Sequence, residues 1–193
     1  DYREITTVAE RDELLQKLKE APEYVLNVIF GDGTIYNSYP DYLCFSTAVN
    51  TACYLRLPSA KDKAEDVIRL FKPILEDQNK VLISNDVKDD IIWLRRAGVE
   101  ILNKIFDVKI AHYVLQPDSS HELERVALEM LNYRLIKGDN TENPQLSLFP
   151  DEGAKKDKDF AERTDILFRL KEKLEEALQE VGLYKLYEEI EMP

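Results

Sequence analysis

The stretch from Ala21 to Phe30 reads Ala-Pro-Glu-Tyr-Val-Leu-Asn-Val-Ile-Phe and is where the predicted sheet begins. Proline disfavours helical geometry in the residue before it, so the charged amphipathic helix expected over residues 8–20 ends at Pro22. The β-branched and aromatic residues that follow are typical of a strand. The turn-forming sequence Gly31-Asp32-Gly33 closes that strand.

The periodicity of apolar residues predicts further strands and helices downstream. Strands are expected at residues 42–49 and 52–57, joined as a hairpin around Asn50-Thr51, and later at 80–84 and near 105–107. Helices are expected at residues 61–77, 87–97, 108–115, 122–131, about 160–181 and, as a short one, 183–190. This order is typical of a mixed sheet flanked by helices, in a single α/β or α+β domain over residues 1–193.

One long segment lacks this periodicity. Residues 137–159 contain few apolar side chains apart from Leu146, Leu148 and Phe149. We expect a long mobile loop there.

The bulk composition limits the possible functions. The chain carries a formal net charge of −12, and affinity for a DNA backbone comes mainly from Lys and Arg, so the isolated domain is expected to bind DNA weakly at best. No run approaches the roughly 20 apolar residues of a membrane span, and residues 1–4 do not resemble a signal peptide. Two cysteines, Cys44 and Cys53, are too few to staple the fold, so we expect a cytoplasmic protein with reduced thiols.

Four segments, in order, resemble the 3′–5′ proofreading exonuclease domain of bacterial family A DNA polymerases (DNA polymerase I). Residues 21–29 are similar to the first strand of that family, and residues 88–90 to its Lys-aromatic-Asp motif. Residues 106–123 are similar to its FD…A-x-Y-L-L…H-x-L stretch, and residues 182–193 to the segment before the polymerase thumb. The resemblance covers nearly the whole chain and implies a ribonuclease H-like exonuclease fold with a central mixed sheet.

The resemblance also implies where a catalytic site would lie. In the family, two metal ions about 4 Å apart hydrolyse the phosphodiester, and they are held by four carboxylates beside a catalytic Tyr. Strand alternation puts the first two carboxylates on one face, and this chain has Asn27 and Ile29 there. The third carboxylate remains as Asp90. In the last helix the match puts Arg163 at the fourth ligand position and Asp159 at that of the Tyr.

These substitutions remove most of the metal-binding chemistry. Mg²⁺ requires carboxylate oxygens, whereas Asn27 offers a neutral amide oxygen, Ile29 offers none and Arg163 is a cation. We therefore expect no catalytic residue, no bound metal and no other cofactor at these positions. The remaining carboxylate needs a counter-charge, so Asp90 and Arg163 are expected to form an ion pair across the former metal site.

The alternative is an active exonuclease with a rearranged site that uses Mg²⁺ or Mn²⁺. Asp165 would replace the fourth ligand if the last helix were shifted by two residues. That shift would turn Ile166, Leu167 and Leu170 to the wrong faces. Asp32, a possible substitute for the missing Glu, lies between two glycines, where a turn residue is the better interpretation.

Neighbouring residues have ordinary structural interpretations. Successive helical residues point in different directions, so Asp89 is expected to be solvated, and Asp86 is expected to cap the helix that follows it. Trp93 is expected in the core. His112 and His121 are too isolated for a metal site and are expected to be structural.

The sequence thus predicts a vestigial exonuclease domain that serves as a structural module beside the polymerase domain of the same chain, in DNA replication and repair. The parent chain is expected to be a DNA-directed DNA polymerase that makes the contacts with DNA, and residues 183–193 begin the junction to its polymerase domain. A reading that ignores the resemblance is an acidic α/β interaction domain with an unrelated partner.

Overall fold

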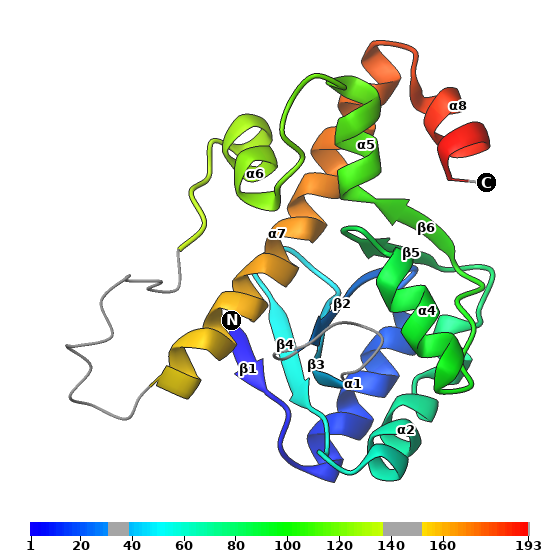
Figure 1. Ribbon diagram of the computed structural model, residues 1–193, viewed down its shortest axis with the longest axis vertical. Helices are drawn as coiled ribbons and strands as arrows, with labels where there is room; N and C mark the ends of the chain where they lie inside the picture. Colours follow the sequence, from blue (N-terminus) through cyan, green and yellow to red (C-terminus); the bar gives the residue numbers. More distant parts are fainter. Residues whose placement is uncertain (31–38, 137–151, 193) are drawn as a thin grey trace.

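The chain forms a six-stranded sheet with helices on both faces (Figure 1). A computed structural model describes residues 1–30, 39–136 and 152–192, with the side chains of 152–158 excepted. The strands are β1 (Tyr2–Glu4), β2 (Glu23–Phe30), β3 (Pro40–Ser46), β4 (Ala52–Arg56), β5 (Val81–Ser84) and β6 (Lys104–Asp107), in the spatial order β1-β4-β3-β2-β5-β6.

The sheet is mixed, as the sequence predicts. Strand β3 pairs antiparallel with both β2 and β4, which confirms the hairpin around Asn50-Thr51. The pairs β2–β5, β5–β6 and β1–β4 are parallel. Strand β1 was not expected from the sequence, because three residues are too few for a period-2 pattern to be recognised. Its strand conformation depends on pairing with β4, where Tyr2 lies opposite Ala52.

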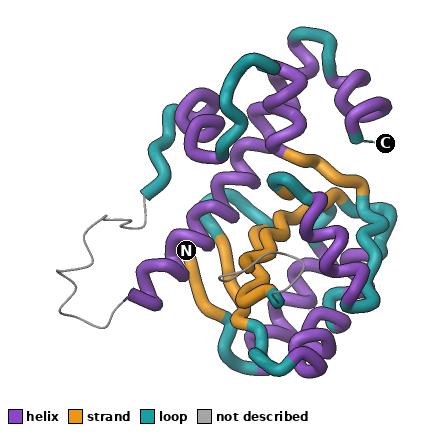
Figure 2. The backbone as a smooth tube through the Cα atoms, viewed as in Figure 1, coloured by secondary structure: helices purple, strands orange, loops and turns teal. Residues whose placement is uncertain are grey.

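Helices cover the two faces of the sheet in separate layers (Figure 2). Their bounds are α1 Val8–Glu20, α2 Lys61–Arg69, α3 Lys72–Leu75, α4 Lys88–Arg96, α5 Val108–Leu115, α6 Leu123–Leu131, α7 Glu152–Glu180 and α8 Tyr184–Leu186, followed by a π-helical segment, η1, Tyr187–Glu191. One core lies under α1 to α4 and contains Leu26 of β2, and the other lies under α5 to α7 and contains Val25. Adjacent residues of β2 thus serve opposite cores, as strand alternation requires.

The single helix predicted over residues 61–77 is divided into α2 and α3. Pro73 lies in the first turn of α3, where the missing N–H of proline costs nothing. In the middle of one continuous helix the same proline would remove a hydrogen bond and clash with the preceding turn. The apolar stripe crosses this break, so periodicity alone did not reveal it.

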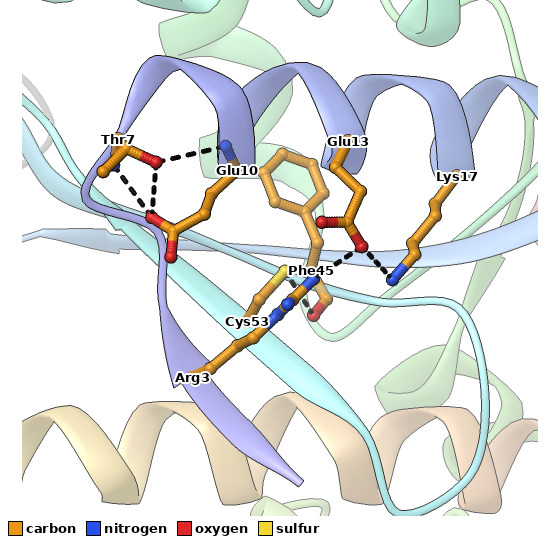
Figure 3. Close-up of polar contacts among 7 residues, drawn as sticks. All are labelled: Arg3, Thr7, Glu10, Glu13, Lys17, Phe45 and Cys53. Atoms are coloured by element: carbon orange, nitrogen blue, oxygen red, sulfur yellow. Dashed lines mark hydrogen bonds and ion pairs between the residues drawn. The ribbon is translucent and has the colours of Figure 1, made fainter.

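Helix α1 begins with a capping box that also lies next to the sheet edge (Figure 3). The Thr7 hydroxyl accepts from the Glu10 backbone N–H at 3.2 Å, and the Glu10 carboxylate accepts from the Thr7 N–H at 2.9 Å. One turn later, Glu13 pairs with Lys17 on the same helix and with Arg3 of β1. The short strand β1 is therefore held both by β4 and by the polar side of α1.

The loop predicted over residues 137–159 is partly wrong. Residues 137–151 lie outside the described part of the chain, but α7 already begins at Glu152. The sequence Glu-Gly-Ala-Lys-Lys-Asp-Lys-Asp at 152–159 has no apolar periodicity, so its pattern predicts a loop. Most of its residues nevertheless favour or tolerate helix, and the packed helix that follows supplies the nucleus they extend.

No helix in the described residues is long and apolar enough to cross a membrane.

Candidate functional site

The candidate site lies where α7 crosses the face of the sheet that carries Asn27 and Ile29. In the β2–β3 ladder, Asn27 lies opposite Cys44 and Ile29 opposite Tyr42, so these side chains share one face. The ring of Phe160, on α7, packs 5.6 Å from that of Tyr42. The amide of Asn27 is 3.5 Å from the hydroxyl of Thr164. An amide and an apolar side chain therefore occupy this part of the strand, close to α7.

Helix α4 brings Asp90 to the end of the neighbouring strand β5. The Asp90 carboxyl is 9% exposed and lies 3.5 Å from the Ser84 hydroxyl, at the last residue of β5. Burial raises the pKa of Asp90 well above its usual range; Ser84 opposes this, while the nearby carboxylates of Asp89, Asp107 and Asp86 add to it. The effect of burial exceeds the help that a helix N-terminus gives to a carboxylate. Asp90 is thus a buried carboxyl that favours its protonated form.

The neighbouring Asp89 is exposed, as predicted, whereas Asp86 does not cap α4. Asp86 instead pairs with Lys109, 2.6 Å away. The N–H of Val87 is bound by Asp107 from the next strand, at 2.8 Å. The capping prediction is wrong because a carboxylate distant in sequence takes the position that a local one was expected to fill.

Arg163 turns away from Asp90 and towards α6. Its guanidinium is ion-paired to Glu124 of α6 and lies 3.6 Å from Asp159, one turn earlier on α7. Within the described residues no ion pair joins Arg163 to Asp90, so that prediction is wrong. The physical reason is that Glu124 and Asp159 already lie within ion-pairing distance of the Arg163 guanidinium and satisfy its charge.

Two buried polar residues show how α7 faces the sheet. Thr164 faces Asn27, whereas Asp165 accepts a hydrogen bond from the Tyr2 hydroxyl at 3.0 Å and from the Asn50 backbone N–H at 2.6 Å. Ile166, Leu167 and Leu170 are buried, as the unshifted register requires. Asp165 is therefore engaged with residues at the β1–β4 edge of the sheet. The other candidate substitute, Asp32, lies outside the described residues.

The donor set does not fit a pair of divalent metal ions. Mg²⁺ and Mn²⁺ bind carboxylate oxygens, but Asn27 is neutral and Ile29 has no donor, so Asp90 is the remaining carboxyl of the three. Arg163 places a cation, already paired with two carboxylates, on the helix that should supply the last ligand. No group of three or more His, Cys, Asp or Glu side chains in the described residues is arranged to hold a metal ion.

The sequence does not single out Glu162, and it predicts His112 and His121 to be isolated structural residues. Glu162 is buried and accepts from the Tyr133 hydroxyl at 2.7 Å and the Ile136 N–H at 3.1 Å, which ties the chain after α6 to α7. The Nδ1 atoms of His112 and His121 are 2.8 Å apart, so these residues are not isolated from each other. The sequence signal for Glu162 is a charged residue within an otherwise apolar helical face. The histidine pair has no sequence signal, because it depends on how the connection between α5 and α6 folds.

The comparisons with known proteins agree on the family. A sequence model described as 3′–5′ exonuclease, for the exonuclease domain of family A DNA polymerases, matches residues 2–179. DNA polymerase I of Borreliella burgdorferi is 28% identical over 203 aligned residues, covering 100% of this chain and 21% of the relative. DNA polymerase I of Pseudomonas aeruginosa is 27% identical over 147 residues, covering 72% of this chain and 16% of the relative. The chain thus spans about a fifth of the length of these relatives.

Solved structures with low sequence identity share the fold. The catalytic core of RRP6 from Trypanosoma brucei superposes with a TM-score of 0.78 at 20% identity, over 100% of this chain and 51% of that one. NrnC from Brucella melitensis gives 0.72 at 18% identity, over 97% and 84%. Pol1 from M. smegmatis, in complex with DNA primer-template and dNTP, gives 0.74 at 15% identity, over 100% and 30%. With the ribonuclease H-like sheet in place and the family match spanning most of its length, the chain belongs to the 3′–5′ exonuclease family of DNA polymerase I.

Proposed function

We propose that this chain is a catalytically inactive 3′–5′ exonuclease domain that serves as a structural module beside the polymerase domain of a longer protein. The observation that carries the proposal is the donor set at the family's ligand positions. Asn27 and Ile29 replace the two carboxylates of the first strand, and Arg163 is committed to Glu124 and Asp159. Two-metal hydrolysis needs both ions to stabilise the attacking and leaving oxygens, and these side chains supply neither site.

The proposed partner is the polymerase domain of the same chain. Apolar side chains are exposed near the C-terminal end of the described chain, with Val181 at 60%, Leu186 at 39% and Ile190 at 65%. They follow the long helix α7, and exposed apolar groups of this kind favour contact with a neighbouring domain. With a net charge of −12, the isolated domain is expected to bind DNA weakly, so contact with DNA is assigned to the parent polymerase.

Nuclease activity separates this proposal from the alternative of an active enzyme. The 193-residue chain would be incubated with a 5′-labelled single-stranded oligonucleotide and Mg²⁺ or Mn²⁺. The proposal expects no release of nucleotides above a metal-free control. Metal-dependent release that Asp90→Ala abolishes would overturn it and support a rearranged active site. Release that persists in Asp90→Ala would identify a contaminating nuclease.

A restored variant provides the matched control. Asn27→Asp, Ile29→Glu, Asp159→Tyr and Arg163→Asp together recreate the family's residues around Asp90. A ligand that binds only the folded state raises the midpoint of thermal unfolding, so Mn²⁺ is expected to stabilise the restored variant and leave the natural chain unchanged. An equal shift in both proteins would show that the natural residues already bind the metal.

A further inference from the structure

One buried carboxylate, Asp107, joins the starts of two helices. It is the last residue of β6 and is fully buried. Its Oδ1 accepts from the backbone N–H groups of Lys109 and Ile110 at 2.9 and 3.1 Å, which caps α5. Its Oδ2 accepts from the N–H of Val87, directly before α4, at 2.8 Å. Since the first N–H groups of a helix have no partner within the helix, one side chain here serves two helices.

The backbone of the same residue is held by the C-terminal segment. The N–H of Asp107 donates to the Tyr187 hydroxyl at 2.8 Å, and that hydroxyl lies 3.3 Å from the Asp107 carbonyl oxygen. The Tyr187 ring is 2% exposed and packs 5.2 Å from the ring of Phe106. Strand β6 lies at the edge of the sheet, next to the C-terminal segment in Figure 1. The phenol thus satisfies edge groups that a further strand would otherwise bind.

These contacts form a continuous connection from the C-terminal segment to α4. Tyr187 begins η1, a π-helical segment whose neighbouring residues are largely exposed. Asp107 lies opposite Ser84 in the β5–β6 register, and Ser84 in turn contacts Asp90. If η1 moves, the Tyr187 hydroxyl no longer accepts from the Asp107 backbone N–H. The backbone of Asp107 is then held less firmly, and so is its carboxylate, which binds the Val87 N–H before α4.

We propose that Tyr187 is a positioning residue that couples the C-terminal segment to the N-terminal turn of α4, through Asp107. The position of that segment sets how firmly the turn carrying Asp90 is held. The coupling is a property of the packed chain and does not depend on whether the site is active. It does not require a change of fold, because only the hydrogen bonds around one carboxylate have to loosen.

Amide hydrogen exchange measured by NMR tests this coupling. Tyr187→Phe removes only the hydroxyl, and we expect the amides of Val87 and Ile110 to exchange about fivefold faster, which corresponds to one lost hydrogen bond. The matched control is Tyr24→Phe, which removes another buried hydroxyl, bound to Asn103 at 2.8 Å on the other side of the sheet. It is expected to lower global stability to a similar extent and to leave local opening at Val87 and Ile110 unchanged.

Equal acceleration in both variants would reduce the role of Tyr187 to global stability, and no acceleration in Tyr187→Phe would exclude the coupling. The path is tested in the background Asp107→Asn, whose amide can accept from fewer backbone groups. There, adding Tyr187→Phe is expected to have no further effect on the Val87 amide. A full fivefold effect in that background would show that the coupling does not pass through the Asp107 carboxylate.

Discussion

Arg163 of α7 is ion-paired to Glu124 of α6, and it stands where the sequence resemblance implies a metal-binding aspartate. The pair fastens α6 to the long helix, and Asp159 extends it along α7 at 3.6 Å. The cation thus contributes to packing between two helices at a point where the catalytic relatives of the fold need a ligand. The chain therefore shares the fold of its family, while its residue at this position forms an ion pair between helices.

The Arg163–Glu124 pair is expected to contribute modestly to stability. The two side chains are 31% and 41% exposed, and pairs with this exposure are screened by water and salt. A double-mutant cycle with Arg163→Met and Glu124→Gln, measured by urea denaturation, should give a coupling of about 0.5 kcal/mol that falls in 1 M salt. The exposed pair Lys173–Glu176 provides the control. A coupling no larger than that of the control would show that the pair does not fasten α6.

Asp90→Asn is expected to stabilise the chain at neutral pH. Because burial raises the pKa of Asp90, the folded state favours the protonated form, whereas the unfolded carboxyl has a pKa of about 3.9. The stability of the natural chain relative to Asp90→Asn therefore falls as pH rises from about 4 to the raised pKa, by about 1.4 kcal/mol for each unit of elevation. Urea denaturation from pH 3 to pH 8 measures the difference. A flat difference for Asp90→Asn over this pH range would contradict the assignment.

The His112 pKa is expected to lie below the usual value of about 6.5. Burial lowers it, and the hydrogen bond to Glu129, 3.3 Å from Nε2, opposes this. His121 and Arg125 add positive charge that lowers it further. A lowered pKa means that His112 binds a proton more weakly in the folded state than in the unfolded state. Its contribution to the free energy of unfolding is therefore complete above about pH 6.5 and is lost as pH falls through the folded pKa.

An NMR titration of the His112 ring protons checks this directly. The expected midpoint is below that of His112 in the urea-unfolded chain, measured in the same way as an internal control. A midpoint above the unfolded value would mean that the carboxylate of Glu129 outweighs burial.

Glu162 is expected to be a stabilising buried carboxylate. Glu162→Ala removes the acceptor of both the Tyr133 hydroxyl and the Ile136 N–H. Both donors lie on residues that water reaches, so the loss of the two hydrogen bonds should cost about 1–3 kcal/mol in total. Tyr133→Phe removes one donor only and should cost about 1 kcal/mol. Chemical denaturation measures both values. If Glu162→Ala were no more costly than Tyr133→Phe, the link between α7 and the chain after α6 would be weaker than its geometry indicates.

Most of the secondary structure could be predicted from the sequence, because apolar periodicity records which side of each element is buried. The bounds of α1, α5 and α6 agree with the expectation to within one residue, and Trp93 lies in the core as predicted. The failures share a cause. In each case the apolar pattern does not report the structure. Strand β1 is too short to show a period, and the first turns of α7 have no apolar face. The apolar stripe of residues 61–77 continues across the break between α2 and α3, so it does not reveal that break.

The sequence by itself determined the fold class, the family resemblance and the chemical types at the positions where that resemblance implies metal ligands, since an Asn, an Ile and an Arg are not carboxylates in any conformation. Only the tertiary structure decided which groups these side chains meet. Arg163 forms an ion pair with Glu124, and Asp107 rather than Asp86 binds the backbone N–H of Val87 before α4. The Nδ1 atoms of His112 and His121 lie within hydrogen-bonding distance. The physical reason is that periodicity gives the direction in which a side chain leaves the backbone, whereas the partner of a charged group depends on which distant segments the packed sheet and helices bring within a few ångströms of it.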